Sequence, residues 1–127
     1  MTFIRFWGRN LKVPSGSFGP DSGSYKITTY TDTTVLTQND FNQVHRMNST
    51  SNKQFTLPEI TTPMIGKWFI LRKINTGYLA VAASGSDNIE DATPVSCNTT
   101  DTDSFIMVMA AALTKWEVHQ ERGQWSS

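Results

Sequence analysis

The stretch Lys53–Leu71, KQFTLPEITTPMIGKWFIL, decides the fold. Two runs of strand-forming residues, QFTL and WFIL, flank an insert with two prolines and Gly66. Proline lacks the amide that a sheet ladder needs, so Pro58 ends the first run. Gly66 permits a sharp turn into the second. We therefore expect Gln54–Leu57 and Trp68–Ile74 to be separate strands, joined by a crossover to another sheet or edge.

The length and charge of the chain limit the kinds of partner that the protein can attract. The chain has 127 residues, enough for one domain, and carries 11 acidic and 11 basic residues. This balance provides no long-range field to attract nucleic acid or an anionic membrane. The amino-terminal apolar run is too short for a signal peptide or a membrane span. Because Cys97 is the single cysteine, no internal disulfide can form, and we expect synthesis in a reducing cytoplasm.

The chain divides into two parts. Residues 1–24 combine an aromatic and basic segment, FIRFWGR, with a linker rich in Gly, Ser and Pro. Residues 25–127 contain short runs of Thr, Val, Ile, Phe and Tyr between turn residues, which indicates an all-β domain. We predict an amino-terminal arm followed by an antiparallel, jelly-roll-like β-sandwich of about seven to eight short strands. The expected strands are Tyr25–Tyr30, Val44–Met47, Gln54–Leu57, Trp68–Ile74, Tyr78–Ala82, Phe105–Met109 and Trp116–His119.

Two local features refine this prediction. The loop Asn75–Gly77 lies between Trp68–Ile74 and Tyr78–Ala82, with glycine where a left-handed residue closes a hairpin, so these strands are expected to pair. A side-chain cap from Thr37 or Asn39 predicts a one-turn helix through Asp40–Asn42, and a simple turn is the alternative. No repeat of 20–50 residues is visible in the sequence, which disfavours a solenoid or propeller.

The histidines and the cysteine do not form a recognisable catalytic motif. His45 and His119 lack the spacing of a metal site and are expected to be surface or partly buried polar residues. Cys97 and His45 would form a nucleophile pair only if the fold brought them together. We expect Cys97 to be a half-buried thiol without a catalytic role.

The carboxylates of the segment SGSDNIEDAT form an acidic cluster that suggests a calcium site. Asp87, Glu90 and Asp91 lack the alternating ligands and the terminal bidentate Glu of a calcium loop. A solvated turn is the expected structure, and no metal or cofactor is predicted.

The aromatic residues suggest binding. Trp68 and Trp116 lie in strand patterns and are expected in the core. Trp7 and Trp125 lie near the ends of the sequence and are candidates for docking on a partner protein. Tyr78 and Trp125 are the candidates for surface or glycan contact.

The order of short motifs resembles the β domain of bacteriophage tail-fibre and head-fibre proteins. The residues are found in TYTDTTVLTQNDFNQVHRMNSTSNKQFTLPE, GKWFILRKINTGYLAVAASGSDNIED and SFIMVMAAALTKWEVHQERGQW. The matching positions are Asp40 with Val44, Thr56-Leu57-Pro58, Gly66, Asp87 with Ile89, and Leu113 with Trp116 and Val118. The resemblance covers roughly residues 28 to 125.

This resemblance implies a virion structural protein without a catalytic site, built as a homotrimer and associated with the major capsid protein or other virion proteins. It would be made in the host bacterial cytoplasm. As a small decoration, head-fibre or tail-accessory protein, it would use its arm as an anchor. Phe3, Phe6 and Trp7 would enter an apolar groove of the particle, and Arg5 and Arg9 would pair at its rim. Alternatively, residues 3–7 are the first strand of the sandwich.

Two other functions remain open. A carbohydrate- or receptor-binding module at a fibre tip would contact host surface glycans through exposed aromatic and amide groups. A β-trefoil is suggested by GKWFILRKINTGYLAVAASG, but that unit should then recur about every 40 residues, and it occurs once.

Overall fold

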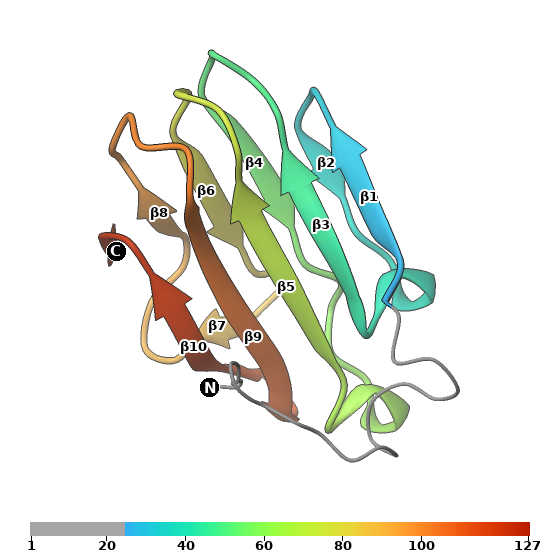
Figure 1. Ribbon diagram of the computed structural model, residues 1–127. Coiled ribbons are helices and arrows are strands. Elements are labelled where there is room, and N and C mark those ends of the chain that lie inside the picture. Colours follow the sequence, from blue (N-terminus) through green and yellow to red (C-terminus); the bar gives the residue numbers. More distant parts are fainter. Residues whose placement is uncertain (1–24) are drawn as a thin grey trace.

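The computed structural model describes residues 25–127, which form two β-sheets packed face to face (Figure 1). Sheet A has the strand order β1-β3-β5-β9-β10-β7, and sheet B has the order β11-β8-β6-β4-β2. The strands are β1 (Ile27–Tyr30), β2 (Thr34–Val35), β3 (Gln43–Met47), β4 (Lys53–Thr56), β5 (Trp68–Lys73), β6 (Leu79–Ala82), β7 (Asn88–Ile89), β8 (Val95–Cys97), β9 (Ser104–Ala112), β10 (Lys115–Arg122) and β11 (Trp125–Ser126). Two short 3₁₀ helices complete the described elements, η1 (Gln38–Asp40) and η2 (Thr62–Met64).

The all-β sandwich is confirmed, and each of the seven expected strands is present within a few residues of its predicted bounds. The described range nevertheless contains eleven strands rather than seven or eight. The additional ones, β2, β7, β8 and β11, are two or three residues long. A strand of that length is too short to display an alternating pattern, so the sequence could not reveal it.

The expected antiparallel, jelly-roll-like pairing is wrong for the first half of the domain. From β1 to β6 the chain alternates between the sheets, so each strand lies parallel to the strand two positions earlier. Antiparallel pairs begin only where β8 and β9 join the sheets. The winding resembles a solenoid coil, but its turns are unequal: paired residues are 17 positions apart in one turn (Ile27 and Val44) and 26 in the next (Val44 and Ile70). Unequal turns conceal any repeat.

The predicted hairpin is also wrong, because β5 belongs to sheet A and β6 to sheet B. The loop between them is an arch that crosses the sandwich. Gly77 is needed there for close packing rather than for a left-handed conformation. Its amide donates to the Ser49 carbonyl at 2.9 Å, and a Cβ added at Gly77 would lie 2.1 Å from the Ser51 carbonyl oxygen.

The crossover expected between Pro58 and Gly66 is confirmed. β4 ends at Thr56 in sheet B, and the chain passes through η2 before β5 begins in sheet A. Gly66 has a φ of +94°, a conformation that residues with a Cβ rarely adopt, and its amide donates to the Ala110 carbonyl at 2.8 Å. This hydrogen bond fixes the start of β5 beside β9.

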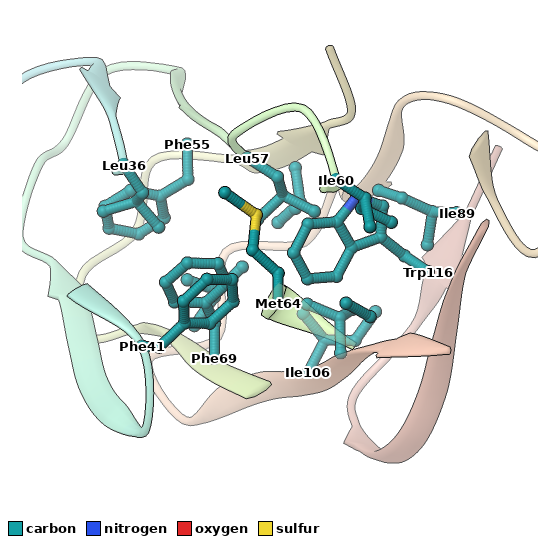
Figure 2. Packing of buried hydrophobic residues seen from close by; sticks show 14 of the residues in the cluster. Leu36, Phe41, Phe55, Leu57, Ile60, Met64, Phe69, Ile89, Ile106 and Trp116 are labelled. Carbon is teal, nitrogen blue, oxygen red and sulfur yellow. The ribbon is translucent and has the colours of Figure 1, made fainter. Parts of the chain in front are cut away.

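Aromatic rings fill the space between the sheets. The rings of Phe41 and Phe69 stack with centroids 4.5 Å apart, and Phe69 lies 5.8 Å from the fully buried Trp116. Figure 2 shows Met64 between this phenylalanine pair and Trp116. Phe41 directly follows η1, which is capped by Thr37 as expected, although the helix ends at Asp40. Trp116 is a core residue as predicted.

Candidate interaction surface

His45 is a structural residue of the core. It is fully buried on β3, where its Nδ1 lies 2.9 Å from the Tyr30 hydroxyl and its Nε2 2.9 Å from the Asp40 carbonyl oxygen. A carbonyl only accepts, so Nε2 carries the proton and Nδ1 accepts from Tyr30. Burial lowers the pKa of His45 below its usual value. The expectation of a surface or partly buried histidine is wrong for His45, whereas His119 is exposed beside Glu117.

The structure does not form a Cys97–His45 nucleophile pair. Cys97 is completely buried on β8 rather than half-buried, and its Sγ lies 3.4 Å from Thr99 Oγ1. Both ring nitrogens of His45 are used by Tyr30 and Asp40. Neither side chain therefore has a free group directed at the other.

The acidic cluster is divided among separate structural contacts. Asp87 is buried, not solvated as expected, and accepts a hydrogen bond from the Ile60 amide at 2.8 Å. Glu90 accepts from the Val118 amide at 3.1 Å, while Asp91 is fully exposed. Within residues 25–127, no group of three or more His, Cys, Asp or Glu side chains is arranged to hold a metal ion. Asp87 instead ties its loop to the β4–β5 crossover.

Lys73 is a buried cation that the sequence analysis did not identify. Its Nζ donates to the carbonyls of Asn75, at 2.9 Å, and Asp101. Hydrogen bonds from the Ser104 and Thr99 hydroxyls lower the pKa of the Asp101 carboxyl to about 2. The alternation of β5 was the available signal, because Lys73 shares the inward side of the strand with Phe69 and Leu71. These contacts close one end of the sandwich.

The outer face of sheet A is rich in large apolar side chains. One row of register partners crosses four strands, and we call it the apolar row: Ile27, Val44, Ile70 and Met107. Next to it, Trp68 pairs with Met109 on β9. All six side chains are partly or largely exposed, and Ile27 is 57% exposed. Trp68 was expected in the core, but it lies on the outward side of β5 together with Ile70.

An arginine row borders the apolar row across sheet A. It consists of Thr29, Arg46, Arg72, Phe105 and Arg122. Asp103 accepts from both Arg72 and, at 2.5 Å, Arg122. The two guanidinium groups lie 5.8 and 6.0 Å from the centre of the Phe105 ring. Arg46 donates to the Thr29 hydroxyl, so this border is positively charged.

The described chain begins on the same face. The Tyr25 ring packs edge-on against Trp68, with centroids 5.7 Å apart. Burial raises the pKa of the Tyr25 phenol. The expected anchoring residues Phe3, Arg5, Phe6, Trp7 and Arg9, and the choice between an arm and a first strand, lie outside the described residues. What the structure places is the point from which that segment extends.

The outer face of sheet B is different in character. One row consists of Gln54, Ala80, Ser96 and Ser126, and another of Val35, Thr56 and Ala82. Apart from Val35, these side chains are small or polar. This face therefore offers few apolar groups to a partner.

Tyr78 and Trp125 do not form a shared platform. Trp125 pairs with Cys97, which pairs with Leu79, so these three residues share the inward side of sheet B. Trp125 packs against the core, and its Nε1 donates to the Arg122 carbonyl at 2.9 Å. Tyr78 precedes Leu79 by one residue and is 38% exposed. Trp125 is half-buried rather than fully exposed, and its part in docking on a partner stays a prediction.

The sequence matches no protein-family model, and no curated protein is significantly similar to it. Among the described residues, no helix has the length and apolar character needed to cross a membrane.

Proposed function

We propose that this protein is a structural component of a bacteriophage particle, with no chemistry of its own. It would be a small capsid decoration, head-fibre or tail-accessory protein. Residues 1–24 and the outer face of sheet A would together form its attachment surface. A homotrimer is part of the proposal, following the family that the sequence resembles.

One observation carries the proposal: the apolar outer face of sheet A is also the face from which the amino-terminal segment extends. Tyr25, the first described residue, packs against Trp68 on this face. An apolar row with a charged border is the composition of a protein interface, in which a desolvated centre is enclosed by a polar rim. The border here contains Arg46, Arg72 and Arg122.

The positions that carry the resemblance have structural roles that suit a display scaffold. Leu57, Ile89 and Trp116 are buried, Gly66 starts β5, and Asp87 holds the crossover. Two of the buried ionisable groups, His45 and Lys73, are engaged in hydrogen bonds of the fold. The domain would thus provide a firm support for one interacting face.

The test is addition of the purified protein to phage particles that lack it. We expect the full chain to bind, and removal of residues 1–24 to reduce binding strongly. Ile70→Lys should also reduce binding, because it places a charge in the centre of the apolar row. Binding that is unchanged by both alterations would contradict the proposal.

A further inference from the structure

A second surface lies near the carboxyl-terminal end of the chain and is lined by residues of β7, β8 and β10, strands whose positions Figure 1 shows. A pocket of about 510 Å³ lies there between the two sheets. We call it the side groove. Its apolar lining consists of Ile89, Val95, Ile106, Val118 and Trp125. Its volume is in the range of sites that enclose a ligand or several side chains.

The rim of the side groove is acidic. Glu90, Asp91 and Glu121 line it, and no lysine or arginine among the described residues does. Lys115 approaches Asp91 only to 4.0 Å. Glu90 is fixed by the Val118 amide, while Glu121 has no ionic partner within residues 25–127. An apolar floor beneath these carboxylates suits apolar side chains that alternate with cations.

Strand β11 gives the groove an edge at which a polypeptide can pair. It is the last strand of sheet B, so within residues 25–127 one side of it has no neighbouring strand. The opposite border is closed, since the Ile89 amide donates to the Ala92 carbonyl within its own turn. Backbone pairing at an open edge, combined with side-chain pockets, is a recurrent way to bind an extended segment. The geometry therefore favours a peptide over a compact small molecule.

The chain itself contains a segment with this chemistry. Residues 3–12, FIRFWGRNLK, carry five large apolar side chains and three cations, and the first carboxylate of the sequence is Asp21. We infer that the side groove binds residues 3–12 of a neighbouring copy of this protein. Arg5 and Arg9 would face the acidic rim, and Phe6 or Trp7 would cover the apolar floor beside Trp125.

This inference rests on the proposed function, because the arms would link copies that stand side by side on a particle. The inference specifies the side groove of a neighbouring copy as the site on the particle that binds residues 3–12. The outer face of sheet A would contact the shell, while the arms link adjacent copies. Each link would tie one copy to a neighbour that is already bound. The links would therefore raise the affinity of the copies for the particle without adding contacts to the shell.

Disulfide trapping in the full chain tests the inference. Phe6→Cys is made in one preparation and Glu121→Cys in another that carries a mass tag, and the two are mixed under mild oxidation. Cys97 is fully buried, so it does not compete. We expect a disulfide between the two kinds of chain, at least about tenfold more than with Glu117→Cys. Glu117 is the matched control, because it is exposed on the same strand but pairs with Met109 on the outer face.

Equal trapping at positions 117 and 121, or none, would overturn the inference. Binding of the arm within its own chain would also overturn the inference. To test this alternative, a chain that carries both Phe6→Cys and Glu121→Cys is diluted into an excess of the same chain with a mass tag. If the arm binds within its own chain, only internal disulfides will form. Trapping between tagged and untagged chains is the expected result.

A charge exchange separates this inference from the proposed function. Glu121→Arg should weaken association of copies by about tenfold, and Arg5→Glu with Arg9→Glu in the partner chain should restore it, as measured by light scattering. Particles that lack the protein should still bind single copies of Glu121→Arg through sheet A. Association unaffected by the exchange refutes the side groove alone. Particles that reject both the native chain and Glu121→Arg refute the proposed function alone.

Discussion

The two outer faces of the sandwich differ although both sheets share one core. Sheet A presents the apolar row, Trp68 and Met109, bordered by arginines. Sheet B presents Gln, Thr, Ser and Ala at the corresponding outward positions of its central strands. A free domain gains nothing in folding stability from large apolar side chains that face water. This difference is the reason why we propose sheet A, and not sheet B, as the attachment face.

The largest loss of folding stability is expected from a substitution in the core between the two sheets. Trp116→Ala should destabilise the domain by about 3–5 kcal/mol, because it opens a cavity between the sheets. Trp116→Phe should cost less than half as much. The buried indole Nε1–H has no acceptor among the described residues, so its loss removes an unsatisfied donor. Urea denaturation measures both values; equal losses would contradict the assigned packing.

A charge placed on each face tests the comparison directly. Ile70→Lys on β5 should weaken particle binding by at least about tenfold, or 1.4 kcal/mol. Ala80→Lys is the matched variant on β6, the central strand of sheet B, and should change binding less than twofold. Titration of purified protein onto particles that lack it gives both affinities. Comparable losses from the two variants would remove the distinction between the faces.

The interior of sheet A contains a buried histidine that should make folding stability depend on pH. Burial lowers the pKa of His45 in the folded state below the usual histidine value of about 6.5. Below about pH 6.5 the unfolded chain therefore binds a proton that the folded chain excludes, and stability falls as the pH decreases, by at most about 1.4 kcal/mol per pH unit. His45→Gln should flatten this slope between pH 6.5 and 5. An unchanged slope, in urea titrations at each pH, would show that His45 is not the group responsible.

The smallest effect concerns the border of the apolar row. Asp103→Asn removes the carboxylate that pairs with Arg72 and Arg122. Because all three side chains are substantially exposed, the free energy of unfolding should change by only about 0–1 kcal/mol. Particle binding should become more dependent on ionic strength, since two arginines lose their intramolecular partner. A loss above 2 kcal/mol would mean that the border is part of the folding core.

The sequence predicted what depends on local rules. Pro58 and Gly66 marked the crossover, alternation marked the seven longer strands, and Thr37 marked the cap of η1. It failed where long-range packing decides. Gly77 signals a turn equally well in a hairpin and in an arch between sheets, and only the packing of neighbouring arches distinguishes them. The burial of His45 and Lys73 was not predicted, because their hydrogen-bond partners are distant in the sequence or are backbone carbonyls.

The candidate surface was predictable only in part. The outward side of β5 could be read from the alternation of Trp68, Ile70 and Arg72 with buried neighbours. The apolar row could not, because it requires the parallel register that places Val44 beside Ile70. The side groove was likewise invisible, since Ile89, Val118 and Trp125 come together only when β7, β10 and β11 end the two sheets.

Hydroxyl-radical footprinting of the particle-bound chain tests the central claim most directly. Met107 and Met109 report on the outer face of sheet A, and Tyr78, at the start of β6, reports on a surface outside it. We predict that particle binding strongly protects both methionines relative to the free chain and leaves Tyr78 unchanged. Equal reactivity of the methionines in both states, or protection at Tyr78 alone, would contradict attachment through sheet A.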